Sequence, residues 1–280
     1  MFLLSINWNP SPILFHLGPI AIRYYSLMFV IAFLLGIYIE KKLYNNDKVS
    51  VELVDSLFIY TAVATLLGAR LGDVFFYSWD YYKDHLLEIL LPVKFNPFHF
   101  TGFRGLASHG AAIGVIISMF LYQKYKLPNK SILWILDRVV IPVAIGGAFV
   151  RIGNLMNSEI VGKYTGTDFG LIFHRHYDEV LKAYDTAPRH PTQIYEAISY
   201  VMVFLVLWYI YWKTDKRTKE GYLFGVFMIL LWTVRFIIEF FKIAQLEDRA
   251  SWSLNTGQWL SIPLILIGLY FVFRKQKASS

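Results

Sequence analysis

Nine residues at the end of a long apolar run gather the polar side chains best suited to chemistry. The stretch RIGNLMNSE, residues 151–159, follows the uninterrupted apolar segment VVIPVAIGGAFV. The glycine–asparagine pair that comes soon after Arg151 favours a break in the helix, which would expose backbone N–H groups beside the guanidinium. A guanidinium with such donors suits a phosphate group. The stretch therefore predicts an anion site at the edge of the apolar segment.

Charged residues also interrupt other apolar segments. An arginine near the centre of a bilayer costs at least ~2.5–3.5 kcal/mol, so it usually faces the inside of a helix bundle and has a partner. Arg70 precedes Asp73 by three residues, and Arg235 is followed four residues later by a glutamate, Glu239. Both spacings allow pairing within one helix, so each arginine is either half of a structural pair or part of a site. Asp137 lies near one rim of its apolar segment, where a structural role is favoured.

Two histidines and a tyrosine extend the set of candidates. His109 lies in GLASHGAAIG, where small neighbours predict either a close contact between helices or room for a ligand against the imidazole. His190 precedes Pro191, a residue typical of the first turn of a helix, and a capping or interface role is favoured for it. Tyr25 is either a site residue or part of an aromatic belt. The sequence has no cysteine, and its histidines lack metal-ligand spacing, so neither a metal nor a cofactor is expected.

The elements that must position these residues are membrane-spanning helices. The chain of 280 residues is 56% hydrophobic and has a mean hydropathy of +0.45. Its apolar residues form continuous blocks close to the ~20 residues that a helix needs to cross a bilayer, and continuity favours helices over a barrel. The predicted fold is an all-α integral membrane protein, a bundle of seven transmembrane helices at about 19–40, 53–77, 105–123, 132–150, 193–212, 221–242 and 257–273.

The distribution of basic residues predicts the orientation of this bundle. Thirteen of the 27 Lys and Arg residues lie in short segments on one side, whereas the segments on the other side are much longer and hold nine. Dense positive charge marks the cytoplasmic side, so the N-terminus is expected outside and the C-terminus in the cytoplasm. The net charge of +7 then reflects topology and contact with anionic membrane lipids, and nucleic acid is not expected as a partner. No cleavable signal peptide is expected. The basic segments are 41–52, 124–131, 213–220 and 274–280.

Six stretches of the sequence occur in the order that one known family shows. They are GPIAIRYYSLMF, GARLGDVFFY, SHGAAIGV, GAFVRIGNLMNSEIVGK, RHPTQIYEA, and RFIIEFFK followed by LNTGQWLSIP. Between Gly18 and Pro263 the chain thereby resembles the prolipoprotein diacylglyceryl transferases. The resemblance implies transfer of the diacylglyceryl group of phosphatidylglycerol to the lipobox cysteine of a prolipoprotein signal peptide, with a thioether and glycerol 1-phosphate as products. It departs at Ala111, where the family commonly has a second glycine, and the extra methyl group could narrow the cavity.

The resemblance also implies roles for individual residues. Arg151 and Arg235 would clamp the phosphate, and Asn154 would assist. His109 is the first candidate for the base that takes the thiol proton; Tyr25 is the alternative, or His109 only orients the lipid. The remaining matched positions are phosphatidylglycerol-binding or supporting ones: Arg70, Asn157 and Gly162 for binding, and Glu159 and Glu239 for support. Glu239 would orient Arg235, and Glu159 and Asn157 would shape the loop around the headgroup. Apart from the resemblance, Asp137 and His190 are expected as further supporting residues.

These implications place the protein in the bacterial cytoplasmic (inner) membrane as a multi-pass enzyme. We expect one transmembrane catalytic domain, residues 1–280, with a small external cap at about 151–192 and an active site toward the outer face. Two alternatives remain open. An anion or lipid transporter would need an inward-opening state, and the sequence shows no paired broken helices to support one. A structural scaffold would leave the arginine and asparagine clusters unexplained.

Overall fold

The computed structural model describes residues 5–18, 20–91, 93–95, 98–100, 107–178, 182–243 and 254–275. The chain forms two compact units. The first unit comprises Met1–Glu40 together with Leu136–Ser280, and the second comprises Lys41–Ile135. Each unit has its own packing. Whether they act as one catalytic domain stays a prediction.

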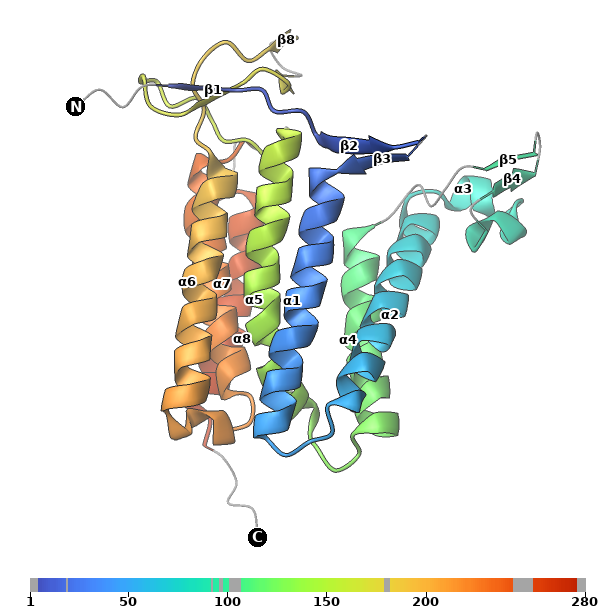
Figure 1. Ribbon diagram of the computed structural model, residues 1–280, viewed down its shortest axis with the longest axis vertical. Coiled ribbons are helices and arrows are strands. Elements are labelled where there is room, and N and C mark those ends of the chain that lie inside the picture. Colours follow the sequence, from blue (N-terminus) through green and yellow to red (C-terminus); the bar gives the residue numbers. More distant parts are fainter. Residues whose placement is uncertain are drawn as a thin grey trace. The chain divides into compact units, whose positions relative to one another are not determined.

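The first unit is built from long helices that lie side by side (Figure 1). Small residues let these helices approach closely: a Cβ at Gly225 would lie 2.8 Å from the Gly268 carbonyl oxygen. Buried Ala148, Ala197 and Tyr200 form an apolar cluster where these helices pack together. The helices are α1 (Tyr24–Asn46, whose end enters the second unit), α5 (Ile132–Asn157, which begins there), α6 (Thr192–Lys213), α7 (Tyr222–Ile238) and α8 (Thr256–Phe273), with the 3-10 turns η2 (Asp215–Thr218) and η3 (Glu239–Phe241).

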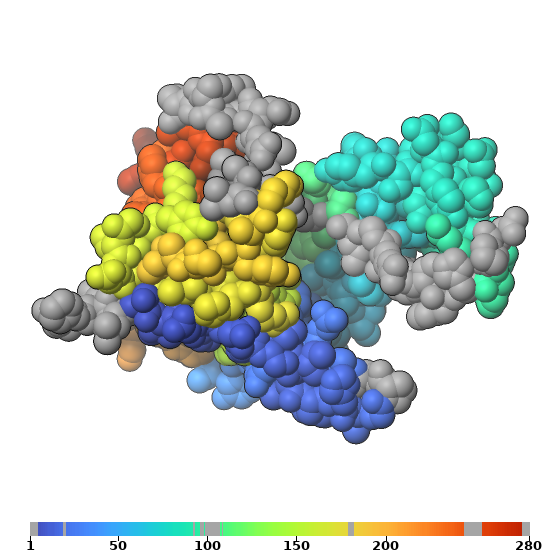
Figure 2. Space-filling model, turned by 90° about the horizontal axis from the view of Figure 1, so that it is seen from above, coloured from blue at the N-terminus to red at the C-terminus, as the bar shows by residue number. Residues whose placement is uncertain are grey.

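One end of these helices is covered by a cap. We define the cap as the described part of residues 158–191 together with β1. Strand β1 (Ile6–Trp8) pairs in parallel with β6 (Leu171–Phe173), and the dark blue segment that contains β1 lies along one edge of the yellow-green part of the cap in Figure 2. Leu155, Val161, Leu171 and Phe173 form its apolar core. The remaining strands of this unit form two hairpins, β2 (Ile13–Leu17) with β3 (Ile20–Arg23) and β7 (Tyr177–Asp178) with β8 (Ala183–Tyr184).

A buried arginine organises the interior of the cap. Arg189 is 2% exposed, and its Nε donates to Asp185 Oδ2 at 2.7 Å. Its Nη1 donates to the Gly162 carbonyl oxygen at 3.3 Å, and its guanidinium carbon lies 3.7 Å from the centre of the Tyr164 ring. Burial raises the pKa of the Tyr164 hydroxyl above its ordinary value. The charge pair and the ring contact thus hold the last part of the cap, at Asp185 and Arg189, against its first part at Gly162 and Tyr164.

The second unit is centred on two helices, α2 (Glu52–Phe76) and α4 (Ser108–Lys126). Both contain glycines four residues apart, GARLG in α2 and GAAIG in α4, which is the pattern of close helix packing in membranes. A Cβ at Gly110 would lie 2.2 Å from the Gly68 carbonyl oxygen. The small residues beside His109 therefore serve helix contact. The other elements are α3 (Trp79–Tyr82), η1 (Leu86–Ile89) and the hairpin of β4 (Val93–Phe95) and β5 (Phe98–Phe100).

Long helices occupy all seven predicted positions, and five of the helical segments described are long and apolar enough to cross a membrane. The all-α prediction is thus confirmed as a mostly helical fold with short strands added. The count of seven membrane crossings and the orientation of the termini stay predictions. The five segments are Glu52–Phe76, Ile132–Asn157, Thr192–Lys213, Tyr222–Phe241 and Thr256–Phe273.

The contact between α2 and α4 generates a first prediction. Gly110→Val places a side chain against the backbone of Gly68 and Gly72, so we expect the helices to separate and the stability to fall by about 1–3 kcal/mol or more. Thermal unfolding in detergent measures the effect. The matched control is Ala112→Val, since Ala112 is exposed on the same helix. Equal melting temperatures for the two variants would contradict the packing described.

Candidate active site

Helix α5 continues through Arg151 and ends at Asn157, so the expected break after Arg151 is wrong. The reason is the role of Gly153, which is buried within the helix. A Cβ there would lie 2.7 Å from Cδ2 of the Tyr25 ring, so the glycine admits this ring instead of ending the helix. The N–H groups after Arg151 are used inside the helix. Side chains must therefore supply the donors for an anion at this place.

Arg151 is held by a carboxylate on the neighbouring helix. Its Nε lies 2.9 Å from Oε2 of Glu196 in α6, a close ion pair whose atoms are not aligned as a hydrogen bond. The Glu196 side chain is completely buried, whereas 17% of the Arg151 side chain remains exposed. Nη1 of Arg151 also donates to Asn154 Oδ1 at 3.3 Å. Pairing makes a buried carboxylate tolerable and aims the guanidinium while leaving it partly accessible.

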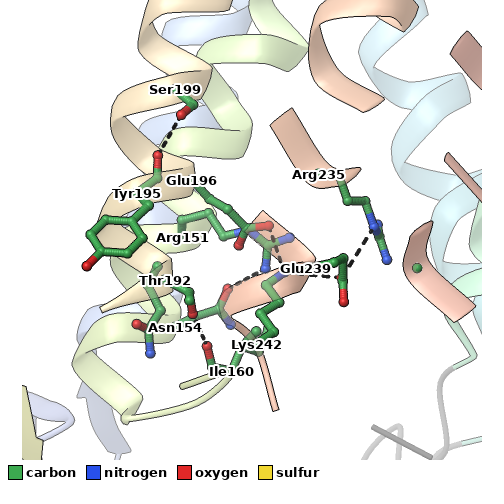
Figure 3. Close-up of polar contacts among 12 residues, drawn as sticks. Arg151, Asn154, Ile160, Thr192, Tyr195, Glu196, Ser199, Arg235, Glu239 and Lys242 are labelled. Atoms are coloured by element: carbon green, nitrogen blue, oxygen red, sulfur yellow. Dashed lines mark hydrogen bonds and ion pairs between the residues drawn. The ribbon is translucent and has the colours of Figure 1, made fainter. Parts of the chain in front are cut away.

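Lys242 continues this pairing toward α7. Its Nζ lies 2.8 Å from Glu196 Oε1 and 3.6 Å from Glu239 Oε1. Glu239 Oε1 in turn lies 3.9 Å from Arg235 Nε. Figure 3 shows the resulting series of alternating charges. We call it the alternating ion chain: Arg151, Glu196, Lys242, Glu239 and Arg235.

Arg235 is the least constrained member of this chain. Its side chain is 37% exposed, but its Nε is buried and has no hydrogen-bond partner among the residues that the structure describes. A buried donor without an acceptor costs free energy. An anion that reached Arg235 would remove that cost, so the predicted pairing with Glu239 is confirmed as a loose ion pair that leaves the guanidinium able to bind more.

The start of α8 fixes Glu239 in place. Asn255 Nδ2 donates to Glu239 Oε2 at 3.1 Å and to its backbone oxygen at 3.2 Å. Asn255 and Gln258 also form a capping box at the first turn of the helix. A Cβ at Gly257 would lie 2.6 Å from Glu239 Cδ, so a side chain at this position would displace the carboxylate from where it lies. The stretch LNTGQWLSIP thus serves as the support of Glu239.

The Glu159 carboxylate accepts hydrogen bonds from both asparagines of the predicted site. Asn154 Nδ2 donates to Glu159 Oε2 at 3.1 Å, and Asn157 Nδ2 donates to Oε1 at 3.0 Å. Tyr25 lies near enough to interact with Asn154 and with the charges of Glu159 and Arg151. Four predicted site residues are therefore brought together with Arg151 at the end of α5.

The turn after α5, residues 158–160, has a strained backbone that is held in place by hydrogen bonds from α6. Ser158 and Ile160 both have φ of 56°, a left-handed conformation that is uncommon for residues with a Cβ. Gln193 Nε2 donates to the Glu159 carbonyl oxygen at 2.6 Å, and Thr192 Oγ1 donates to that of Ile160 at 2.9 Å. Both donors come from the first turn of α6 and are fully buried. They hold the turn in a shape that it would not adopt alone.

Gly162 and His190 pack where the cap meets α7. A Cβ at Gly162 would lie 2.5 Å from the His190 carbonyl oxygen and 2.8 Å from that of Phe241. The His190 ring contacts the Phe241 ring at 5.0 Å, and its Nδ1 lies 3.3 Å from the Tyr195 hydroxyl. Burial lowers the pKa of His190. These contacts give both residues a packing role; binding of lipid by Gly162 stays a prediction.

Asp137 is far along α5 from Arg151 and caps another helix. Its side chain is completely buried, and it accepts hydrogen bonds from the backbone N–H groups of Gly221 at 2.7 Å and Phe224 at 2.8 Å. These groups begin α7, where a helix has unpaired donors and a positive dipole end. The favoured structural role of Asp137 is thus supported.

Arg70 belongs to the second unit and is buried there. Its Nε donates to the Ile89 carbonyl oxygen at 2.8 Å, and Nη2 donates to that of Glu88 at 2.8 Å and to the Tyr82 hydroxyl at 2.9 Å. The Tyr81 hydroxyl donates to the Glu88 carboxylate at 2.6 Å, which raises the pKa of Tyr81 to about 12 and lowers that of Glu88. Arg70 therefore fastens η1 to α2, and its predicted contact with phosphatidylglycerol stays a prediction.

His109 is exposed at the first turn of α4. Its Nε2 lies 3.5 Å from the Tyr77 hydroxyl, and the two rings are 6.1 Å apart. An exposed imidazole is accessible to a ligand, while its neighbour Gly110 is taken up by the contact with α2. His109 and Arg70 lie in the second unit, so their approach to the alternating ion chain stays a prediction.

The sequence reasoning missed Glu196, Lys242 and Asn255. Each lies inside or next to a stretch already singled out: Glu196 in RHPTQIYEA and Lys242 at the end of RFIIEFFK. The available signal was a charged residue at the rim of an apolar segment. Their partners lie on other helices or turns, so no spacing rule within one helix reveals them.

The fold and this site define a multi-pass helical membrane protein in which two arginines are each paired with a glutamate. Comparison with known sequences is more specific, because the model of the family described as prolipoprotein diacylglyceryl transferase matches residues 12–274. The chain belongs to this family.

Three proteins named phosphatidylglycerol–prolipoprotein diacylglyceryl transferase are similar over nearly their whole length. The protein of Bacteroides fragilis is 42% identical over 282 residues, which cover 99% of this chain and 98% of the relative. That of Chloroherpeton thalassium is 39% identical over 272 residues, or 97% and 95% of the two chains. That of Tolumonas auensis is 39% identical over 270 residues, or 96% and 97%.

The buried carboxylate of Glu196 generates the second prediction. Glu196→Gln removes the negative charge that Arg151 and Lys242 share, so two cations would face each other in a poorly hydrated place. We expect a loss of about 3–5 kcal/mol, as for other broken buried pairs, measured by unfolding in detergent. The control Glu52→Gln changes an exposed carboxylate and should cost no more than about 0.5 kcal/mol. Similar losses for the two variants would refute the role of Glu196.

Proposed function

We propose that this chain transfers the diacylglyceryl group of phosphatidylglycerol to the thiol of the lipobox cysteine in a prolipoprotein, the first step of bacterial lipoprotein maturation. The observation that carries the proposal is the alternating ion chain, because it ends in Arg151 and Arg235, the two arginines that the resemblance assigns to the phosphate. The names of the related proteins support both substrates.

The proposed reaction exchanges one bond for another at a glyceryl carbon. The cysteine sulfur attacks the carbon that carries the phosphate ester; a C–S bond forms as that C–O bond breaks. The electron pair of the broken bond leaves with glycerol 1-phosphate, and the thiol proton passes to a base. Negative charge grows on the phosphate oxygens during this step. Guanidinium groups preorganised beside them stabilise the transition state more than the ground state.

The residues around Arg151 have supporting parts in this proposal. Asn154 accepts from Arg151 and donates to Glu159, so its amide sets the direction of the guanidinium. The strapped turn at 158–160 keeps Glu159 and Asn157 beside the headgroup. Arg235 reaches the same phosphate from the other end of the alternating ion chain, with Glu239 as its orienting partner.

His109 is the proposed base. A thiol has a pKa of ~8.5 and an imidazole one of ~6.5, so a neutral histidine can draw off the thiol proton near neutral pH. The exposure of His109 in the second unit supports access by a substrate. Tyr25, which packs against Gly153 near Arg151, is the alternative base, and a contact of Arg70 with phosphatidylglycerol is part of the proposal.

The proposal includes a topology of seven crossings in the bacterial inner membrane. Helices α1 and α4 would add to the five apolar segments, with the N-terminus and the cap outside and the C-terminus in the cytoplasm. The density of Lys and Arg in the segments opposite the cap supports this orientation. The site then faces the outer leaflet, where an exported prolipoprotein arrives.

One reaction tests the function directly. Purified protein is incubated with phosphatidylglycerol and a lipobox peptide, and the products are identified by mass. The proposal expects a thioether-linked peptide and glycerol 1-phosphate. Binding or release of phosphatidylglycerol without either product would favour an anion or lipid transporter, and neither binding nor product would favour a scaffold.

The third prediction tests the topology. A reporter that is active only outside the cytoplasm should be active when fused within residues 160–178 and inactive when fused after Ser280. The reason is the odd number of proposed crossings together with the positive charge of the cytoplasmic segments. Activity of the reporter at Ser280 would overturn the number of crossings and the placement of the site.

The fourth prediction tests the base. His109→Gln removes proton transfer while it keeps a polar side chain, so we expect insertion and melting temperature to be kept and turnover to fall by about 10²–10⁴-fold. Initial rates at saturating phosphatidylglycerol measure this. The control His16→Gln changes an exposed histidine of β2 and should keep the normal rate. Near-normal turnover of His109→Gln would eliminate His109 as the base and direct attention to Tyr25.

A further inference from the structure

Lys242 is a buried ammonium group in the middle of the alternating ion chain. Its side chain is 7% exposed, and its Nζ lies between the carboxylates of Glu196 and Glu239. An unpaired charge at such a place would be strongly unfavourable. Two acidic partners at 2.8 and 3.6 Å therefore explain how the lysine is kept there, but they do not explain why a cation is needed.

The backbone of Lys242 lies where three parts of the site meet. Lys242 follows η3 at the end of α7 and forms an isolated antiparallel bridge with Gly162. Its neighbour Phe241 accepts a hydrogen bond from the Lys163 N–H at 2.7 Å. The side chain reaches Glu196 in α6. A single residue thus links α6, α7 and the segment that follows the turn after α5.

The geometry of the two carboxylates shows what the ammonium group does. Glu196 presents Oε2 to Arg151 and Oε1 to Lys242. A carboxylate with both oxygens open commonly takes an arginine in a forked, two-bond pair. Because Lys242 occupies Oε1, Arg151 keeps donors for another acceptor. At Glu239, Lys242 is nearer to Oε1 than Arg235 is, and Arg235 Nε has no hydrogen-bond partner among the described residues.

We infer that Lys242 is a positioning residue that prevents Glu196 and Glu239 from saturating Arg151 and Arg235, and so keeps both guanidinium groups available for one phosphodiester. This inference rests on the proposed function. With its three cations and two carboxylates, the alternating ion chain holds one positive charge in excess. That excess equals the single negative charge of a phosphodiester. Without Lys242 the chain is electrically neutral, and each arginine has a carboxylate to itself.

The decisive experiment restores the charge excess without restoring the lysine. Lys242→Met keeps the length of the side chain but loses the charge, so kcat/KM for phosphatidylglycerol should fall about 10- to 100-fold, as for other small misplacements of catalytic groups. KM for the lipobox peptide should not change. Adding Glu239→Gln removes the carboxylate that competes for Arg235 but leaves Glu196 beside Arg151, so the double variant should recover part of the lost kcat/KM. Lys242→Arg should remain close to the unsubstituted protein.

A matched control and a second variant separate positioning from folding. Lys41→Met breaks an exposed ion pair with Asp55 by the same substitution and should leave kcat/KM unchanged. If Lys242→Met does not fold, Lys242→Gln takes its place, since it retains a donor but no charge; its loss and its rescue by Glu239→Gln should be the same.

Two results would overturn the inference. One is full activity of the neutral variants at position 242. The other is a double variant that is no more active than the single one while its melting temperature is lower, because a purely structural lysine would behave in this way. Failure of the unsubstituted protein to form any thioether peptide is a different outcome, since it would refute the proposed transferase function itself.

Discussion

The structure of the site depends on one buried carboxylate, that of Glu196, which is completely enclosed and touches two cations. In an apolar bundle Arg151 could not be kept in place without it, and Lys242 would be left with Glu239 alone. The Glu196 carboxylate could not be kept buried without these cations. Because the three groups come from α5, α6 and the end of α7, their pairing also fixes how these helix ends meet. The strained turn after α5 and the backbone bridge between Gly162 and Lys242 lie at this same place.

Glycine residues and the side-chain amides of two asparagines make this pairing possible. Gly153 admits the Tyr25 ring, Gly162 lets the cap cross the end of α7, and Gly257 leaves space for Glu239. Asn154 and Asn255 then set the direction of one charged group each by hydrogen bonds. The result is a set of guanidinium groups that are held by partners but are not saturated by them. Preorganised donors of this kind are what the departure of a phosphate requires.

Much of the fold could be predicted from the sequence, because length and continuity of apolar residues determine helices in a membrane. The group at 151–159 was also identified, since its polar residues are adjacent in the chain. Contacts between distant segments could not be predicted: Glu196 lies 45 residues from Arg151, and β1 pairs with β6 across most of the chain. The helix break at Gly153 was wrong because a glycine can serve a close ring contact as well as a turn. Relations of His109 and Arg70 to the other site residues remain proposals.

The central claim is that Arg151 and Arg235 hold one phosphate together. A double-mutant cycle of Arg151→Lys and Arg235→Lys, scored by kcat/KM for phosphatidylglycerol with the peptide saturating, tests it most directly. Lysine keeps the charge but lacks the planar fork of donors. If both side chains act on the same group, their effects are coupled, and the double variant should be about as slow as the slower single one. A double variant whose loss equals the product of the two single losses would contradict the account.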